Sequence, residues 1–290
     1  MHKVNQVLVV GGTHGNELSG IRIVEQWAEL ARRLNTSAIE FNTLLANPEA
    51  VDKRLRFVEA DLNRQFSTQH LAQVNHSKEA QIAQTLYKQF GPDSNAQPDL
   101  VIDIHNTTSN MGTSLILLER NLFNQQLARF INTVLPACHL LLEDDQSYAD
   151  HPYLCSLGKS GVMIEMGAQP HGVCRADIFA NSLKLLECIA EFLSLWNDQK
   201  LQPFAEASVY QFIENIHFPL DSNQQVTAMV HPSLQDNDFC PISTGEPIFT
   251  GFDGKVQTWD EAQTIYPHFI NEAAYQSTNV AFASARKFNW

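Results

Sequence analysis

The sequence has 290 residues, of which 44% are hydrophobic, and its formal net charge at pH 7 is −13. This hydrophobic content is enough for the buried core of one large domain or two unequal ones, which excludes a disordered or fibrous protein. The acidic charge excludes a nucleic acid and a membrane as partners, because both require a basic surface, so we expect a small-molecule partner.

Cysteine usage and the amino-terminal residues predict a cytoplasmic location. The five cysteines are scattered and form no Cys-x-x-Cys pair, which favours reduced thiols over a disulfide framework. Residues 1–10 are too polar for a signal peptide, and the sequence contains no run of about 18 apolar residues that would predict a membrane-spanning helix.

The first 200 residues alternate between short apolar runs and helical patterns. Residues 7–10 predict a buried strand that enters a tight turn at Gly11-Gly12, and the apolar spacing of residues 18–34 predicts a helix that stops at Asn35. The same patterns predict further strands at residues 39–45, 100–104, 114–118 and 162–166, and helices at residues 78–90, 122–135 and 178–196. Alternation of this kind predicts an α/β fold with a mainly parallel, mixed sheet flanked by helices.

The pattern changes after Trp196, because residues 197–203 are polar and contain a proline. We therefore expect two domains, an α/β domain at residues 1–200 and a smaller β-rich domain at residues 201–290. Residues 226–230 and 247–249 and the Asp253-Gly254 turn predict short strands in the second domain.

His14 and Glu17 follow the first predicted strand, in Gly-Gly-Thr-His-Gly-Asn-Glu. The carboxyl ends of strands in an open α/β sheet are where ligands bind, and an imidazole with a carboxylate suits Zn²⁺. Alone, this pair is weak evidence for a metal site and favours a histidine and a glutamate on a solvated turn.

His105 directly follows the predicted strand at residues 100–104 and supplies a third candidate ligand. Asp103 lies on the same strand face and can orient the imidazole of His105. Three protein ligands with an open fourth position are what a catalytic zinc requires. The alternative is a histidine that caps a loop at the strand end.

Glu165 and the segment 56–64 supply acid, base and cation chemistry. A carboxylate late in an apolar strand is costly unless it is paired, hydrated or functional, so Glu165 is either a general base or one half of a surface ion pair. Arg56 and Arg64 could bind an anionic substrate and stabilise an oxyanion, or could belong to an ordinary charged loop.

Several motifs, in order along nearly the whole chain, resemble the aspartoacylase and succinylglutamate desuccinylase family, and most closely its aspartoacylases. The motifs are Gly-Gly-Thr-His-Gly-Asn-Glu (11–17), Asn-Pro-Glu-Ala-Val (47–51), Asp-Leu-Asn-Arg (61–64), Asp-Ile-His-Asn-Thr-Thr-Ser-Asn-Met-Gly (103–112), Gln-Pro-His-Gly-Val (169–173), His-Pro-Ser-Leu-Gln-Asp (231–236) and Asn-Glu-Ala-Ala-Tyr (271–275). The resemblance implies a catalytic domain similar to that of zinc carboxypeptidases.

The resemblance also implies a role for each matching residue. It implies that His14, Glu17 and His105 hold one Zn²⁺ per chain, that Glu165 is the general base and that Arg56 polarises the acyl carbonyl. It further implies substrate-binding positions and a C-terminal domain that narrows the channel to the site. These positions are Asn63, Arg64 and Tyr275, with Asp61 as a supporting residue.

The resemblance implies a hydrolase that deacylates a small anionic N-acyl amino acid, with N-acetyl-L-aspartate as the leading candidate. One departure concerns specificity: similar aspartoacylases have an arginine ten residues before the catalytic glutamate, and this sequence has Cys155. A thiol cannot replace that cation, although His151, Lys159 or Arg175 could compensate from a rearranged loop.

Three alternatives stay open. The enzyme could be a deacylase or desuccinylase for a different N-acyl amino acid, or the chain could be a catalytically silent metal-binding or metabolite-sensing protein. It could also assemble as a homo-oligomer. Serine-hydrolase and nucleotide-binding chemistry are set aside, because the sequence has no G-x-S-x-G, no P-loop and no G-x-G-x-x-G.

Overall fold

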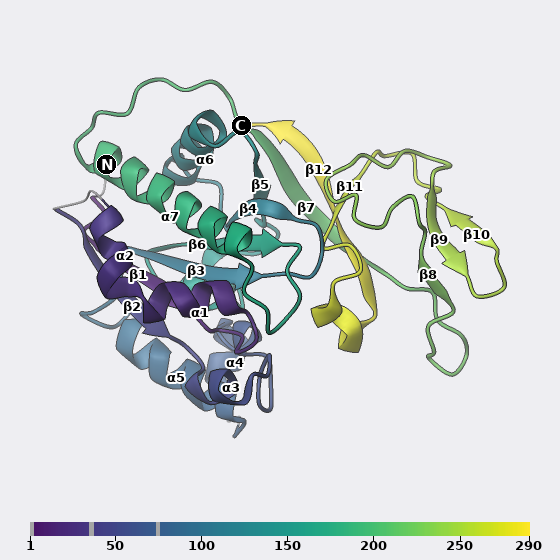
Figure 1. Ribbon diagram of the computed structural model, residues 1–290, viewed down its shortest axis with the longest axis horizontal. Coiled ribbons are helices and arrows are strands. Elements are labelled where there is room, and N and C mark those ends of the chain that lie inside the picture. The colour runs from purple at the N-terminus through teal and green to yellow at the C-terminus, as the bar shows by residue number, and fades with distance from the viewer. Residues whose placement is uncertain (1–2, 35–37, 74–75) are drawn as a thin grey trace.

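The structure is a computed structural model that describes residues 3–34, 38–73 and 76–290 (Figure 1). Its strands are β1 (Gln6–Gly11), β2 (Glu40–Leu45), β3 (Leu100–Asn106), β4 (Gly112–Leu117), β5 (Cys138–Leu142), β6 (Ser160–Gly167), β7 (Ser208–His217), β8 (Ala228–Val230), β9 (Pro247–Gly251), β10 (Val256–Thr258), β11 (Tyr266–His268) and β12 (Val280–Asn289). Its α-helices are α1 (Leu18–Glu25), α2 (Trp27–Leu30), α3 (Pro48–Lys53), α4 (Thr68–Ala72), α5 (Lys78–Phe90), α6 (Leu122–Val134) and α7 (Ala176–Asn197). No α-helix in these ranges is both long and apolar enough to cross a membrane.

Among the described residues, nine strands form one sheet in the order β11-β12-β7-β5-β4-β6-β3-β1-β2. The strands from β6 to β2 pair in parallel, as do β4, β5 and β7. Antiparallel pairs occur between β4 and β6 and among β7, β12 and β11. The prediction of a mixed, mainly parallel sheet is therefore confirmed.

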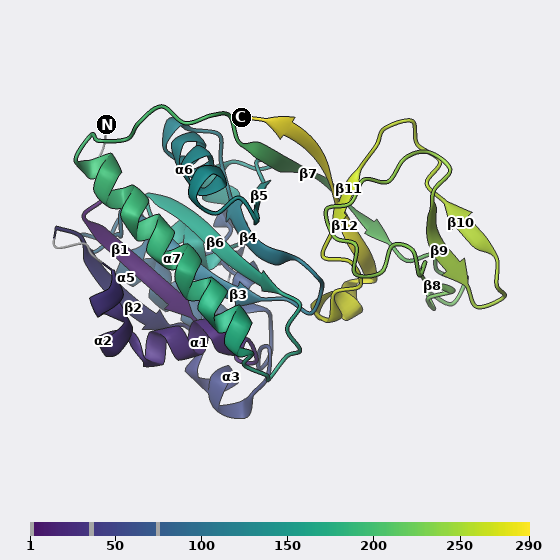
Figure 2. The same cartoon turned by 45° about the horizontal axis from the view of Figure 1, so that its top comes forward.

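Helices cover both faces of the sheet because the central strands are apolar on both sides. The helices α6 and α7 pack on one face, where Ile131, Phe192 and Leu193 join a core with strand residues such as Ile102 (Figure 2). The helix α5 covers the opposite face, where Leu86 packs in a second core. Burial on both faces explains why these strands are continuous apolar runs in the sequence.

The C-terminal part extends away from the helices at one end of the molecule (Figure 1). The strands β8, β9 and β10 form a small antiparallel sheet with its own apolar cluster, while β7, β11 and β12 join the large sheet. The expected β-rich C-terminal region is confirmed as part of the fold class, whereas the division at residue 200 stays a prediction.

Two sequence expectations differ from the structure. The helix expected at residues 18–34 breaks at Gln26, because buried side chains such as Ile21 and Ile23 lie only in α1, whereas α2 has none. The stop expected at Asn35 lies outside the described residues. The ten-residue strands β7 and β12 were missed, because they alternate polar and apolar residues over only part of their length.

Candidate active site at the carboxyl ends of the parallel strands

Neighbouring parallel strands bring the predicted site residues to one edge of the sheet. β1 pairs with β3 and β3 with β6, so their carboxyl ends meet. Gly12 turns the chain after β1 with a φ of 71°, a conformation that glycine adopts readily. A Cβ at Gly20 would lie 2.5 Å from the Ile104 carbonyl oxygen, so α1 can approach β3 closely only because this residue is glycine.

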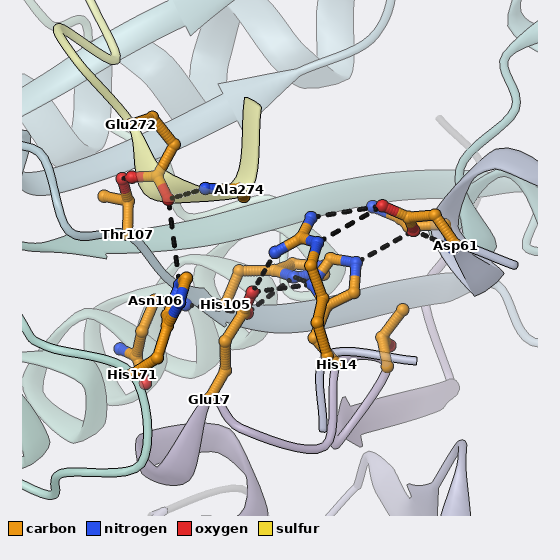
Figure 3. A network of polar contacts seen from close by, with 12 residues as sticks. His14, Glu17, Asp61, His105, Asn106, Thr107, His171, Glu272 and Ala274 are labelled. Carbon is orange, nitrogen blue, oxygen red and sulfur yellow. Dashed lines mark hydrogen bonds and ion pairs between the residues drawn. The ribbon is translucent and has the colours of Figure 1, made fainter. Parts of the chain in front are cut away.

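His14, Glu17 and His105 form one buried cluster (Figure 3). His14 Nδ1 lies 2.7 Å from Glu17 Oε1, and His105 Nδ1 lies 3.1 Å from Glu17 Oε2. The two Nδ1 atoms are 3.3 Å apart. Two imidazole nitrogens and a carboxylate, with their ligand atoms all within 4.8 Å of one another, suit a zinc ion.

Carboxylates behind the cluster orient both imidazole rings. His105 Nε2 lies 2.8 Å from Asp103 Oδ2, and Thr13 Oγ1 donates a hydrogen bond of 2.9 Å to Asp103 Oδ1. His14 Nε2 lies 3.0 Å from Asp61 Oδ1. With the proton of each ring on Nε2, both Nδ1 lone pairs face the cluster, as metal ligation requires.

The electrostatics of the cluster favour an ionised Glu17. Burial raises the pKa of Glu17, but His14 and His105 outweigh burial and lower this pKa well below its ordinary value. Burial lowers the pKa of His105, but Asp103 and Glu17 outweigh it and raise this pKa well above its ordinary value. Glu17 is therefore ionised, as ligation of a metal requires.

Glu165 lies beside His105, because β3 and β6 pair these two residues in register. Its side chain is buried, and its Oε1 has no hydrogen-bond partner among the described residues. Burial raises the pKa of the Glu165 carboxyl well above its ordinary value. No ion pair joins it to an arginine among the described residues, so the geometry favours a functional carboxylate over a surface ion pair.

Arg56 and Asp61 belong to the loop that precedes a short 3₁₀ helix (Leu62–Arg64). Arg56 Nη1 donates to Glu17 Oε1 at 2.8 Å, and its Nε and Nη2 lie 3.3 and 3.2 Å from Asp61 Oδ2. Arg56 lines the cavity over the metal cluster, whereas Asp61 does not and instead contacts His14 and Arg56 from behind. Asp61 therefore contacts the site through His14 and Arg56, and its supporting role stays a prediction.

Asn63, Arg64 and Tyr275 line the same cavity as the three candidate ligands and Glu165. Asn63 Oδ1 accepts a hydrogen bond of 2.8 Å from the Leu154 backbone N–H, which fixes the orientation of its amide. Tyr275 reaches the cavity from a C-terminal 3₁₀ helix (Ala273–Thr278). All the sequence-predicted residues thus gather at one site, which has a cavity of about 50 Å³.

Glu272 links the C-terminal segment to the site and was not assigned a role from the sequence (Figure 3). Its Oε2 accepts hydrogen bonds from the Thr108 and Ser109 backbone N–H groups, at 2.8 and 3.2 Å, and from the Thr107 hydroxyl. It lies in the motif that contains Tyr275, but its partners are more than 160 positions earlier in the chain. Motif membership was the only sequence signal for it.

Glu143 and Tyr153 also line the cavity without having been predicted. Tyr153 Oη donates a 2.7 Å hydrogen bond to Glu143 Oε2, and the Arg64 guanidinium lies 5.3 Å from the Tyr153 ring centre. These three residues, with Phe269 and Tyr275, also line an adjacent outer cavity of about 500 Å³. The small inner cavity and the larger outer cavity thus share one wall.

Cys155 and the three candidate replacement cations do not line the inner or the outer cavity. Cys155 is fully buried in a 3₁₀ helix (Leu154–Leu157). His151 is buried with its Nε2 3.1 Å from a backbone oxygen, Lys159 pairs with Asp99 at 2.8 Å, and Arg175 pairs with Asp177 at 2.7 Å. None of them replaces the missing arginine in this arrangement.

Comparison with known proteins identifies the family. Residues 3–193 match the succinylglutamate desuccinylase/aspartoacylase catalytic domain, and residues 205–287 match the AstE/AspA barrel-sandwich hybrid domain. The chain belongs to the succinylglutamate desuccinylase/aspartoacylase family. This membership confirms the resemblance read from the motifs and the expected hydrolase class.

The relatives and solved structures that this chain resembles carry several different names. An N-acyl-aromatic-L-amino acid amidohydrolase (carboxylate-forming) from Xenopus tropicalis is 40% identical over 98% of this chain and 93% of its own length. The Rattus norvegicus aspartoacylase is 37% identical over 98% of this chain and 93% of its own length. The crystal structure of murine aminoacylase 3 superposes with a TM-score of 0.91 and 34% identity, covering 100% of this chain and 97% of that one. A solved succinylglutamate desuccinylase from Vibrio parahaemolyticus, at 17% identity and a TM-score of 0.64, shares the fold.

Proposed function

We propose that the protein is a zinc-dependent amidohydrolase that cleaves N-acyl-L-amino acids into a carboxylate and the free amino acid. The observation that carries this proposal is the buried cluster of His14, Glu17 and His105 with Glu165 and Arg56 beside it. A catalytically silent protein has no support from this arrangement, because every group that the reaction needs is present.

The donor set fits one zinc ion per chain. His14 and His105 would contribute their Nδ1 atoms and Glu17 a carboxylate oxygen, while Asp61 and Asp103 would hold the rings in place. When bound, zinc supplies a Lewis acid that lowers the pKa of water and polarises the acyl carbonyl.

Glu165 and Arg56 carry the proton transfer and the charge stabilisation. Glu165 takes a proton from the attacking water and returns it to the departing amine, which breaks the C–N bond. Its lack of a hydrogen-bond partner at Oε1 supports this role, because the carboxylate is free to bind water. Arg56 places its guanidinium in the same cavity, where it can stabilise the oxyanion of the tetrahedral intermediate.

The substrate carboxylate would bind at the wall of the cavity. Arg64 and Asn63 offer a guanidinium and an amide, and Tyr275 offers a hydroxyl from the C-terminal segment. Tyr275 and Glu272 line the cavity, so residues after 200 would narrow the access to it. A narrow entrance would favour small acyl amino acids over peptides.

The substrate side chain has two candidates. The similarity to an aspartoacylase, at 37% identity, supports N-acetyl-L-aspartate as the substrate. The similarity to an N-acyl-aromatic-L-amino acid amidohydrolase, at 40% identity, supports a substrate with a neutral, aromatic side chain. Arg64 is the one arginine or lysine that lines the outer cavity within the described residues, and Glu143 and Asp145 line it too. Aromatic side chains such as Phe212 and Phe269 add apolar surface there. The geometry therefore favours a neutral, bulky side chain over aspartate.

A substrate panel tests the proposal. Zinc-loaded protein would be assayed with N-acetyl-L-aspartate and N-acetyl-L-phenylalanine, with chelated protein as the control. We expect hydrolysis that requires zinc and a higher kcat/KM for the phenylalanine substrate. A higher kcat/KM for the aspartate substrate would restore N-acetyl-L-aspartate as the leading candidate, and hydrolysis of neither by zinc-loaded protein would refute the deacylase function.

A further inference from the structure

A buried carboxylate outside the cavity holds the loop that carries Arg56 and Asp61. Glu79 lies in the first turn of α5 and has no exposed surface. Its carboxylate accepts hydrogen bonds from three successive backbone N–H groups, those of Val58, Glu59 and Ala60. These distances are 2.6, 3.1 and 3.0 Å.

A fourth hydrogen bond ties Glu79 to a second loop at the site. Asn47 Nδ2 donates to Glu79 Oε1 at 3.2 Å, and the Asn47 backbone N–H donates to the Gly12 carbonyl at 3.0 Å. Gly12 precedes His14 by two residues. Glu79 therefore connects the loop after β1, through Asn47, with the loop that carries Arg56.

Glu79 is not needed to cap its own helix. Ser77 is the N-cap of α5, and its side chain accepts a hydrogen bond from the Ala80 backbone N–H. Within the described part of the chain, the four hydrogen bonds that Glu79 accepts all come from outside α5. Burial raises the pKa of Glu79, but the backbone N–H groups of Val58 and Ala60 outweigh it and lower this pKa, so the carboxylate is ionised at neutral pH.

The loop that Glu79 holds also carries Arg56, which contacts the residues of the site. The Arg56 carbonyl accepts a 3.2 Å hydrogen bond from the Gly15 N–H, beside His14, and the Arg56 side chain contacts Glu17 and Asp61. The first anchored N–H, that of Val58, is two positions after Arg56. A shift of this anchor therefore moves the guanidinium relative to the metal cluster.

We propose that Glu79 is a positioning residue for the hydrolysis: by holding the backbone of residues 58–60, it sets where the Arg56 guanidinium meets the acyl oxygen. This inference rests on the proposed function. Glutamine at position 79 keeps one acceptor oxygen but turns an N–H₂ donor toward the remaining loop N–H groups, so the loop loses part of its anchor.

A double-mutant cycle with Arg56→Ala separates positioning from a purely structural role. In the wild-type background we expect E79Q to lower kcat/KM by at least about tenfold, measured on protein that is fully folded at the assay temperature. In the Arg56→Ala background, we expect E79Q to lower kcat/KM by less than about threefold, because its effect acts through the missing guanidinium. A loss of threefold or more in that background would overturn the proposal.

Asp99→Asn is the matched control. Asp99 is also a buried carboxylate, and it accepts hydrogen bonds from two backbone N–H groups, those of Asn5 and Gln6, away from the site. It should lower stability but leave kcat/KM within about twofold. Amide hydrogen exchange gives a second readout, and we expect residues 58–60 to exchange faster in E79Q than in wild type.

The outcomes also separate the two hypotheses. Failure of the wild-type enzyme to hydrolyse any N-acyl amino acid refutes the proposed function, whereas normal wild-type turnover with unchanged kcat/KM in E79Q refutes only the role of Glu79. Should E79Q fail to fold, E79D takes its place, because it keeps the charge but is shorter by one methylene, and the same criteria apply.

Discussion

Asp238 makes the stability of the protein depend on pH near neutrality. Its side chain is 9% exposed, Oδ1 accepts a 3.2 Å hydrogen bond from the Ile270 backbone N–H, and Oδ2 has no partner among the described residues. Burial raises the pKa of Asp238 to about 7. Because Ile270 is two residues before Glu272, this carboxyl also stabilises the segment that brings Tyr275 to the site.

The size of the effect follows from the two pKa values. The ordinary value is 3.8 and the folded value is about 7, so the folded state binds the proton more tightly than the unfolded state. The stabilisation is therefore fully present below pH 3.8 and is lost as the pH rises toward 7. Each pKa unit corresponds to about 1.36 kcal/mol, so between pH 5 and pH 7, where the folded group is half ionised, the wild type loses about 2 kcal/mol through this group.

Asp238→Asn removes this pH dependence, because its amide oxygen can still accept from Ile270 and does not ionise. We expect the free energy of unfolding of the variant, relative to wild type, to rise by about 3 kcal/mol from pH 5 to pH 8. Urea unfolding of zinc-loaded protein, followed by circular dichroism at each pH, measures it. The exposed Asp260, changed to Asn, is the control, and its free energy of unfolding relative to wild type should change by less than about 0.5 kcal/mol from pH 5 to pH 8. A pH-independent difference for Asp238→Asn would refute the reasoning.

Three further predictions concern the site. Glu165→Gln should keep one equivalent of zinc while kcat falls by about 10² to 10⁴, and retained turnover would remove Glu165 from the role of base. His105→Ala should lose zinc on dialysis, measured by elemental analysis, and a variant that keeps one equivalent contradicts its role as a ligand. Glu272→Gln should lower the free energy of unfolding by roughly 1–3 kcal/mol, because its buried N–H and hydroxyl partners lose an acceptor. It should also raise KM through displacement of Tyr275, and an unchanged KM would uncouple Glu272 from the site.

The sequence predicted the central part of the fold well, because local patterns and tertiary packing agree there. The helix α5 has the predicted bounds Lys78–Phe90, and β3 and β6 extend the predicted strands by a few residues at their ends. The strands that were not predicted are those whose formation depends on tertiary packing. The strand β7 is half exposed over its second half, and its ladder with β12 joins residues about 70 positions apart, which no local pattern reveals.

The same distinction between local patterns and tertiary packing applies to the candidate site. His14, Glu17, His105 and Glu165 could be predicted because each lies at or near the end of an apolar strand, and parallel strands must end at one edge. Glu143 could not, because its partner Tyr153 and its place in the cavity wall depend on how the chain after β5 folds back. The family resemblance supplied Tyr275, whose contact with the site depends on the whole C-terminal region.

Buried carboxylates hold the loops at the candidate active site, so part of the acidic composition of the chain has a structural role. Loops at the carboxyl ends of strands have backbone N–H groups with no strand partner, and these groups need an acceptor when they are buried. Glu79 accepts from the N–H groups of residues 58–60, and Glu272 accepts from those of Thr108 and Ser109. A carboxylate suits this task better than an amide, because both of its oxygens accept and its charge strengthens each hydrogen bond. Acidic residues thus supply the proposed metal ligand Glu17, the proposed base Glu165 and the carboxylates that hold the loops around them.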